Sequence, residues 1–198
     1  YKMSIFTFNQ SLLRPGLIVS VCSRRAAGYL IRKMLKKAFD DLGPEALKVT
    51  PEVFNHDAIV IKDHGKWYIG DAQPWRARLV PIEEYEKDVN SDYIYCLRVF
   101  SAKGATLEQE EAAAAWWLSN VNGSWYDFMA YPRLIFKCIF GDIFDAAAGW
   151  TWANWCTEGV AEAYSKGAKL DVYHKNNPTP LTTVKRAISG DLVNITEF

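Results

Sequence analysis

The chain has 198 residues, enough for a substantial core, and we expect residues 1–198 to form a single domain. Hydrophobic residues make up 49% of the sequence, which indicates a globular protein and argues against a disordered one. Lysine plus arginine and aspartate plus glutamate both number 23, and this formal net charge of zero argues against nucleic acid as a partner.

The first half of the sequence alternates short apolar runs with one longer amphipathic segment. The apolar runs have the length and β-branched content of buried strands, and the segment 63–65 between two of them is a good hairpin turn. We predict, in chain order, a strand over 16–21, a helix over 25–41, a loop over 43–54, strands over 57–62, 66–70 and 77–80, a short helix from Pro81, and a strand over 93–100.

The second half is mostly helical. Thr106 and Gln109 have capping-box spacing and predict a helix that begins there and ends near Asn120. A helix from Cys156 to about residue 166, a helix over 182–188 and a strand over 191–195 complete the chain. This order predicts an α+β fold in which an antiparallel sheet, or a partial barrel, packs against helices.

Four cysteines are widely spaced and show no C-x-x-C pattern, so the sequence predicts neither a zinc ribbon nor a disulfide framework. Cys96 and Cys138 lie in apolar runs and are expected to be buried packing residues. Cys22 ends an apolar strand, and the pattern leaves its role open. Cys156 differs from the other three because it lies where an aromatic segment turns into a helix.

A cysteine at a helix start is a candidate nucleophile. The first turn of a helix presents free N–H groups and a partial positive charge, and both favour the reactive thiolate over the thiol. His56, before one predicted strand, and Asp71, after the next, are the candidate base and its orienting acid. If the turn has two residues, Asp71 lies diagonally across the hairpin from His56 on the same face.

Simpler interpretations exist for each of these residues. A histidine at a strand end is often a surface or capping residue, and Asp71 alone could cap a turn. His64 lies in the tight turn and should be exposed, and His174 lies in a polar loop without an evident partner. A metal site from His56, His64 and Asp57 matches no known spacing, so we expect no metal and no cofactor.

The sequence shows no apolar run typical of a membrane span and no recognisable signal peptide. No apolar run approaches the roughly 20 residues that span a bilayer, and no signal peptide is visible, so we expect no integral membrane segment. The basic residues of 24–37 are read as the solvated face of a helix rather than a membrane or phosphate patch. The compartment stays open; a cytoplasmic or a virion-associated protein fits equally.

Five segments, in this order, resemble the circularly permuted branch of the NlpC-type papain-like cysteine peptidase superfamily, which includes YiiX-like proteins and lecithin retinol acyltransferase relatives. Permuted members carry the histidine early and the cysteine late, as here. Leu17 stands where that family usually has Asp, and Asp71 stands where Glu is commoner. The matching segments are residues 14–18 (RPGLI), 55–60 (NHDAIV), 68–72 (YIGDA), 124–128 (SWYDF) and 155–160 (WCTEGV).

The resemblance implies a permuted papain-like fold and a cysteine hydrolase. Cys156 would attack an amide or ester carbonyl to form a thioester, His56 would move the proton, Asp71 would orient the ring, and the Cys156 N–H would stabilise the oxyanion. Such enzymes commonly cleave peptides of the bacterial cell wall, so a peptidoglycan stem peptide is the expected substrate. Trp152, Trp155 and Tyr126 are expected to line the substrate groove.

Two other functions fit the sequence. A lipid or acyl-group hydrolase or transferase of the same fold would use the same residues. A structural or binding module of a virion or secretion assembly would keep the fold with or without activity, and the departures at Leu17 and Asp71 motivate that alternative.

Overall fold

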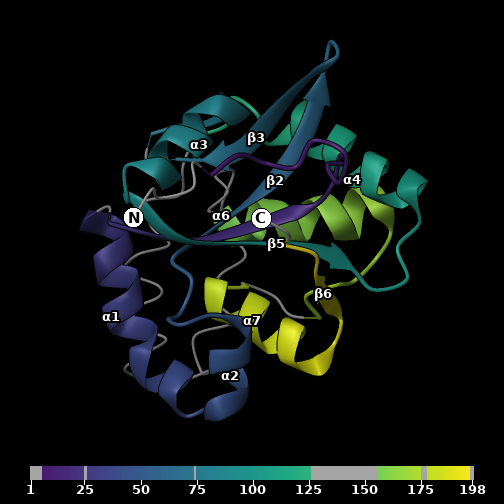
Figure 1. Ribbon diagram of the computed structural model, residues 1–198. Helices are drawn as coiled ribbons and strands as arrows, with labels where there is room; N and C mark the ends of the chain where they lie inside the picture. Colours follow the sequence, from purple (N-terminus) through teal and green to yellow (C-terminus); the bar gives the residue numbers. More distant parts are fainter. Residues whose placement is uncertain (1–5, 25, 74, 126–155, 175–177, 197–198) are drawn as a thin grey trace.

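The structure is a computed structural model that describes residues 6–24, 26–73, 75–125, 156–174 and 178–196. Strands and helices alternate in the first half, and helices dominate the second (Figure 1). The strands are β1 (Ile18–Ser23), β2 (His56–Asp63), β3 (Lys66–Ala72), β4 (Ala77–Pro81), β5 (Ile94–Ala102) and β6 (Leu192–Asn194). The helices are α1 (Ala26–Asp40), α2 (Pro44–Val49), α3 (Ile82–Asn90), α4 (Leu107–Asn120), α6 (Cys156–Glu162), the π-helix η2 (Ala163–Ala168) and α7 (Pro180–Ser189).

The strands form one open antiparallel sheet in the order β4-β3-β2-β1-β5-β6. This arrangement confirms the expected α+β class and the antiparallel sheet. β1 lies in the interior of the sheet, where it pairs with β2 on one side and with β5 on the other. Its six residues are all buried, as its continuous apolar run predicted.

The β2–β3 hairpin has the register that the sequence predicted. Asp63 pairs with Lys66, and the pairing continues to Ile59 opposite Gly70. His64 and Gly65 form the two-residue turn and both have positive φ, which is the conformation that such tight hairpins require. The hairpin register therefore fixes which side chains of β2 and β3 share a face.

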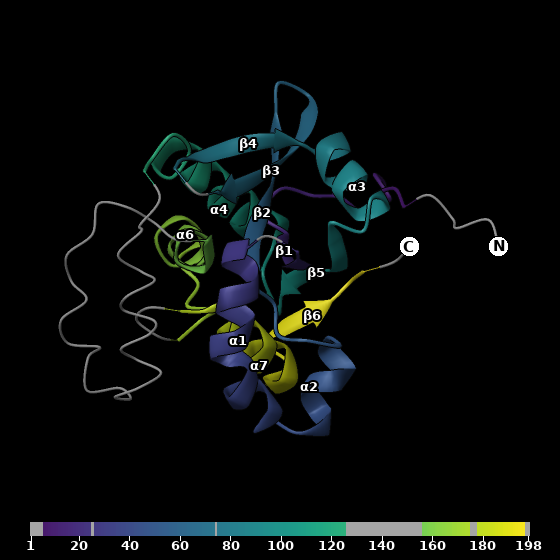
Figure 2. The same cartoon turned by 90° about the vertical axis from the view of Figure 1, so that its left-hand side faces the viewer.

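Each face of the sheet carries its own apolar cluster. Phe54, Ile59 and Phe100 pack with helices α1, α4, α6 and α7 on one face. Val19, Val60 and Leu97 pack with α3 and the segment before β1 on the other. Figure 2 shows α4 and α6 on one side of the sheet and α3 on the opposite side.

The helix α4 approaches both the sheet and η2 closely. Its capping box is formed by Thr106 and Gln109, as expected. Trp117 is fully buried, and its ring packs directly on Gly70. A Cβ added at Gly70 would lie 2.8 Å from that ring and would clash with it. At Gly167 an added Cβ would meet the Cβ of Trp116 at 2.6 Å, so glycine there allows η2 and α4 to pack backbone against backbone.

Two local predictions were wrong. Residues 43–54 were expected to be a loop, but they contain α2, which begins at Pro44. Proline suits the first turn of a helix, and six residues are too few to show a helical period. The Cys156 helix was expected to run to about residue 166, but its α-helical part ends at Glu162 and a π-helix follows to Ala168. Within the described residues, no helix is both long and apolar enough to cross a membrane.

Candidate active site

His56 and Asp71 are in direct contact. His56 begins β2 and Asp71 lies near the end of β3, and the hairpin register brings the Nε2 atom of His56 against Oδ1 of Asp71 in a short contact. The aspartate is 1% exposed and the histidine is mostly buried. The contact occupies one ring nitrogen and leaves Nδ1 as the other polar atom of the ring.

Asp71 is held in place by further hydrogen bonds to its second oxygen. Gln73 donates from Nε2 to Oδ2 at 2.7 Å, and the Tyr85 hydroxyl donates to the same oxygen at 2.9 Å. Tyr85 comes from α3, so a helix on the far face of the sheet fixes the carboxylate. A carboxylate that accepts from several donors keeps one orientation.

Cys156 is the first residue of α6 and is buried, at 2% exposed. The helix packs against β2, which carries His56 (Figure 1). The thiol lies close enough to the histidine to be one of the influences that raise the pKa of the ring. The structure thus brings Cys156, His56 and Asp71 together from segments that lie up to 100 residues apart.

The pKa of His56 lies well above its ordinary value. Burial is the largest influence and by itself would lower this pKa, because it disfavours the charged ring. The negative charge of Asp71, the charge of Cys156 and hydrogen bonds to both oppose it and outweigh it. The local environment therefore favours an imidazolium beside the cysteine.

Asp57, which sequence reasoning did not select for the site, connects the cysteine helix to the histidine strand. Its carboxylate is fully buried and accepts hydrogen bonds from three hydroxyls. Thr157 of α6 donates to Oδ2 at 2.7 Å, Thr183 of α7 donates to Oδ2 at 2.9 Å, and Ser20 of β1 donates to Oδ1. Burial raises the pKa of Asp57, and the three hydrogen bonds with the charge of His56 counteract part of that rise.

The position of Asp57 in the sequence contained a usable signal. An aspartate inside an apolar strand is costly unless it is hydrogen-bonded, so it should have been assigned a polar role in the core. Its partners Thr157 and Thr183 were not identifiable, because they lie 100 and 126 positions from Asp57 and no local pattern pairs residues at such distances.

The far end of the Cys156 helical run is also anchored. Tyr164 of η2 is buried and donates its hydroxyl proton to the carbonyl oxygen of Gly16 at 2.7 Å. Gly16 has φ of +90°, and a Cβ there would lie 2.2 Å from the carbonyl oxygen of Glu110. Only glycine fits this crossing, which explains the glycine in the segment 14–18.

The remaining candidates fall elsewhere. Trp152, Trp155 and Tyr126 lie outside the described residues, as does Cys138. His64 is exposed in the turn, as predicted, and contacts Asp63. The expectation that His174 has no partner was wrong, since it pairs with Asp171 at 3.5 Å. Leu17 is fully buried in the apolar cluster with α3, so an apolar residue suits its position.

The described side chains do not form a metal-binding cluster. Among the described residues, no three His, Cys, Asp or Glu side chains lie together in a way that could hold a metal ion. At the site itself, Nε2 of His56 contacts Oδ1 of Asp71. The other oxygen of Asp71, Oδ2, accepts hydrogen bonds from Gln73 and Tyr85. The described residues do not fit a metal centre.

Comparison with known proteins places the fold. No family model and no curated protein sequence matches the chain. A similar solved structure is the crystal structure of the metalloprotein YiiX from Escherichia coli O157:H7, with a TM-score of 0.54 and 14% identity. The alignment covers 93% of this chain and 97% of that chain, so the two share an overall fold of the YiiX type.

Proposed function

We propose that this protein is a cysteine hydrolase with a permuted papain-like fold. In this proposal Cys156 is the nucleophile, His56 the general base and acid, and Asp71 the residue that orients the ring. The observation that carries it is the meeting of a helix-start thiol with a buried histidine whose second nitrogen contacts a carboxylate. Nucleophile, base and orienting group in contact are the arrangement expected of nucleophilic catalysis.

The electrostatics suit His56 to proton transfer. Its raised pKa favours the charged ring, which can protonate a leaving group. Asp71 contacts Nε2, so Nδ1 is the ring atom available to exchange a proton with the sulfur. In the proposed mechanism Nδ1 takes the proton of Cys156, and the sulfur then attacks the substrate.

The reaction follows from these charges. The Cys156 thiolate attacks the substrate carbonyl, and the backbone N–H at the helix start donates to the oxyanion that forms. The His56 imidazolium then protonates the leaving amine or alcohol, which departs and leaves a thioester on Cys156. Neutral His56 takes a proton from water, the resulting hydroxide attacks the thioester, and the acid is released with the original protonation restored.

The chain order supports the permuted member of the superfamily. His56 precedes Cys156 by 100 residues, whereas ordinary members carry the cysteine first. The fold likeness to YiiX, a member of the permuted group that the sequence resembles, is consistent with this assignment. YiiX is described as a metalloprotein; the residues here do not fit a metal centre, and no step of the proposed reaction uses one.

For the substrate we propose an amide bond in a peptide of the peptidoglycan-stem type. The same three residues would also serve an acyl ester of a lipid, either by hydrolysis or by transfer to another acceptor. A binding module of a virion or secretion assembly is the third candidate, and it differs from the other two in having no turnover.

The decisive experiment compares wild type with Cys156→Ala on purified peptidoglycan and on a lipid ester. We expect wild type to release new amino termini from peptidoglycan, and the variant to lose at least about a hundredfold in rate, since the nucleophile is gone. Intact mass measured shortly after mixing should show an acyl adduct on wild type that hydroxylamine removes.

The matched control is Cys96→Ala, which removes a buried thiol whose hydrogen-bond partner is Thr50 and not a residue of this site. It should retain turnover, and both variants should keep the circular dichroism spectrum of wild type. Unchanged turnover in Cys156→Ala rejects the nucleophile assignment. Release of acid from the lipid ester alone supports the lipid alternative, and no turnover of either substrate supports the binding module.

A further inference from the structure

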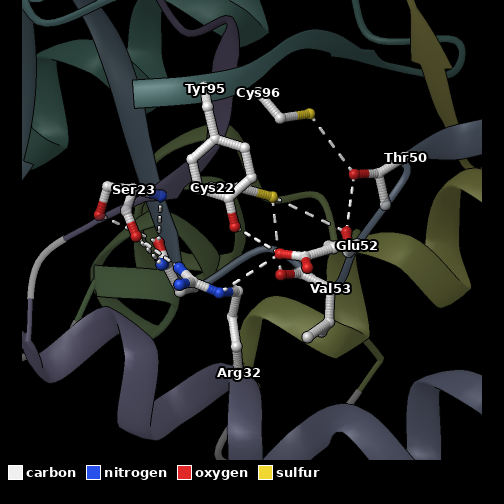
Figure 3. Close-up of polar contacts among 9 residues, drawn as sticks. Cys22, Ser23, Arg32, Thr50, Glu52, Val53, Tyr95 and Cys96 are labelled. Carbon is white, nitrogen blue, oxygen red and sulfur yellow. Dashed lines mark hydrogen bonds and ion pairs between the residues drawn. The ribbon is translucent and has the colours of Figure 1, made fainter. Parts of the chain in front are cut away.

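A second pair of thiols hydrogen-bonds to residues outside the candidate active site. Cys22, near the end of β1, is directly opposite Cys96 of β5 in the antiparallel register, and both are buried as free cysteines. Figure 3 shows the two side chains beside Thr50, Glu52 and Val53. Each thiol is a named influence on the pKa of the other.

The spacing of these strands suits a covalent link. Directly opposite residues of an antiparallel pair have Cα atoms about 4.5 or 5.5 Å apart, depending on whether they form a hydrogen-bonded pair. A disulfide requires a Cα separation of about 4.4–6.8 Å, so either case permits one. We propose that Cys22 and Cys96 are a reversible thiol–disulfide site that a peroxide oxidises.

The polar surroundings divide the roles of the two sulfurs. The hydrogen bond from Cys22 lowers the pKa of Cys96, and the contact with the Thr50 hydroxyl at 3.5 Å and the charge of Arg98 lower it further. The pKa of Cys22 is raised, first by its hydrogen bond to Cys96 and then by burial. Its sulfur contacts the carbonyl oxygens of Glu52 and Val53 at 3.8 and 3.6 Å, as a protonated thiol would.

These charges make Cys96 the attacking group and Cys22 the resolving group. The thiolate, and not the thiol, reacts with peroxides. The raised pKa of Cys22 favours its thiol form, and its position directly opposite Cys96 is one from which it can capture a sulfenic acid as a disulfide.

A groove reaches the neighbourhood of this pair. A cavity of about 650 Å³ lies between α1 and the segment after α2, and the residues that line it include Glu52, Val53 and Tyr95. Two of these provide the carbonyls that touch Cys22, and the third precedes Cys96. The guanidinium carbons of Arg24 and Arg32 lie 5.1 and 5.4 Å from the centre of the Tyr95 ring. A small oxidant that enters the groove therefore lies beside two residues that contact Cys22 and one that precedes Cys96.

The chemistry balances with hydrogen peroxide as the oxidant. The Cys96 thiolate attacks one oxygen, the O–O bond breaks, and the products are Cys96 sulfenic acid and hydroxide, which takes a proton to become water. The Cys22 thiol then attacks the Cys96 sulfur, the S–O bond breaks, and the second oxygen leaves as water. Two thiols lose two electrons to the peroxide, and the sulfurs are joined.

The test uses the native protein, hydrogen peroxide, alkylation of remaining thiols and tryptic mass mapping. Trypsin separates the two cysteines because it cleaves after Arg24 and Lys87. We expect a linked pair of peptides that carry Cys22 and Cys96, and recovery of both alkylated cysteines after dithiothreitol. The Cys156→Ala variant should form the same link, so the result does not depend on the proposed hydrolase.

Two variants test the order of events. Cys22→Ser should leave a Cys96 sulfenic acid that dimedone traps, whereas Cys96→Ser should leave Cys22 unoxidised at the same peroxide concentration. Recovery of both wild-type cysteines as unlinked thiols, or overoxidation of Cys96 without a link, overturns the proposal.

Discussion

Thr157 donates a hydrogen bond to Asp57 across 100 residues of chain, so the residue after Cys156 is bonded to the residue after His56. Asp57 is buried and also accepts from Thr183 and Ser20. One carboxylate therefore joins β1, β2, α6 and α7. This contact makes the relative position of Cys156 and His56 a property of the core rather than of a surface loop.

Thr157 and Thr183 offer a matched pair of variants. Each hydroxyl donates to the same oxygen of Asp57, and each Thr→Val change keeps the shape and removes that bond. Because a hydrogen bond to a buried charge is worth about 1.5–3 kcal/mol, we expect both variants to lose a similar free energy of unfolding, measured by urea titration. Turnover should fall much more in Thr157→Val than in Thr183→Val, because only Thr157 is the chain neighbour of Cys156 and holds it in position. Equal losses of turnover would contradict a positioning role for Thr157.

Asp71→Asn should lower the pKa of His56. The charge of Asp71 is the largest influence that raises this pKa, while burial continues to lower it. NMR titration of the ring should place the variant's pKa clearly below that of wild type, and turnover should fall by about 10²–10⁴-fold as the imidazolium is lost. Tyr85→Phe removes one donor to Asp71 and leaves its charge, so it should move the pKa far less. An unchanged pKa in Asp71→Asn would remove the electrostatic basis of the proposed mechanism.

Stability should depend on pH through His56. Its folded pKa is raised above the unfolded value near 6.5, so its contribution is fully present below pH 6.5 and is lost as pH rises through the folded pKa. The free energy of unfolding should therefore fall above pH 6.5, with a slope from this group of at most about 1.4 kcal/mol per pH unit. In His56→Gln this pH dependence of the free energy of unfolding should vanish. Urea titrations of wild type and variant between pH 6 and 9 measure it. If the free energy of unfolding changes with pH equally in both proteins, the assignment to His56 is contradicted.

Gly16→Ala should be strongly destabilising. The new Cβ would lie 2.2 Å from the carbonyl oxygen of Glu110 at a residue with positive φ. We expect a loss of about 3–5 kcal/mol, the sum of backbone strain and overpacking. Gly190→Ala is the control, since it also has positive φ but no atom within 4 Å, and it should cost about 1–2 kcal/mol. Similar losses in the two variants would show that the crossing at Gly16 can relax.

Much of the fold followed from local patterns. The hairpin turn at His64 and Gly65 and the capping box at Thr106 lie within a few residues of their partners, so their geometry is readable from the sequence. The register of the hairpin then gave the His56–Asp71 contact, because pairing fixes the face of every residue along the two strands.

Other features depend on packing between distant segments. No local pattern could reveal that Thr183 bonds to Asp57, that Tyr164 bonds to Gly16, or that Cys22 lies opposite Cys96. The helix α2 was missed because six residues do not display a period. The order of strands in the sheet, with β1 between β2 and β5, likewise needs the tertiary fold.

The connection of Asp57 to both Ser20 and Thr183 has a consequence for synthesis on the ribosome. The carboxylate obtains its last hydroxyl only when α7 has been translated and has left the exit tunnel, long after β1 and β2 have emerged. A nascent chain that ends before residue 183 therefore lacks this clamp, so the polar core between β1, β2 and α7 is completed only after translation has passed that point.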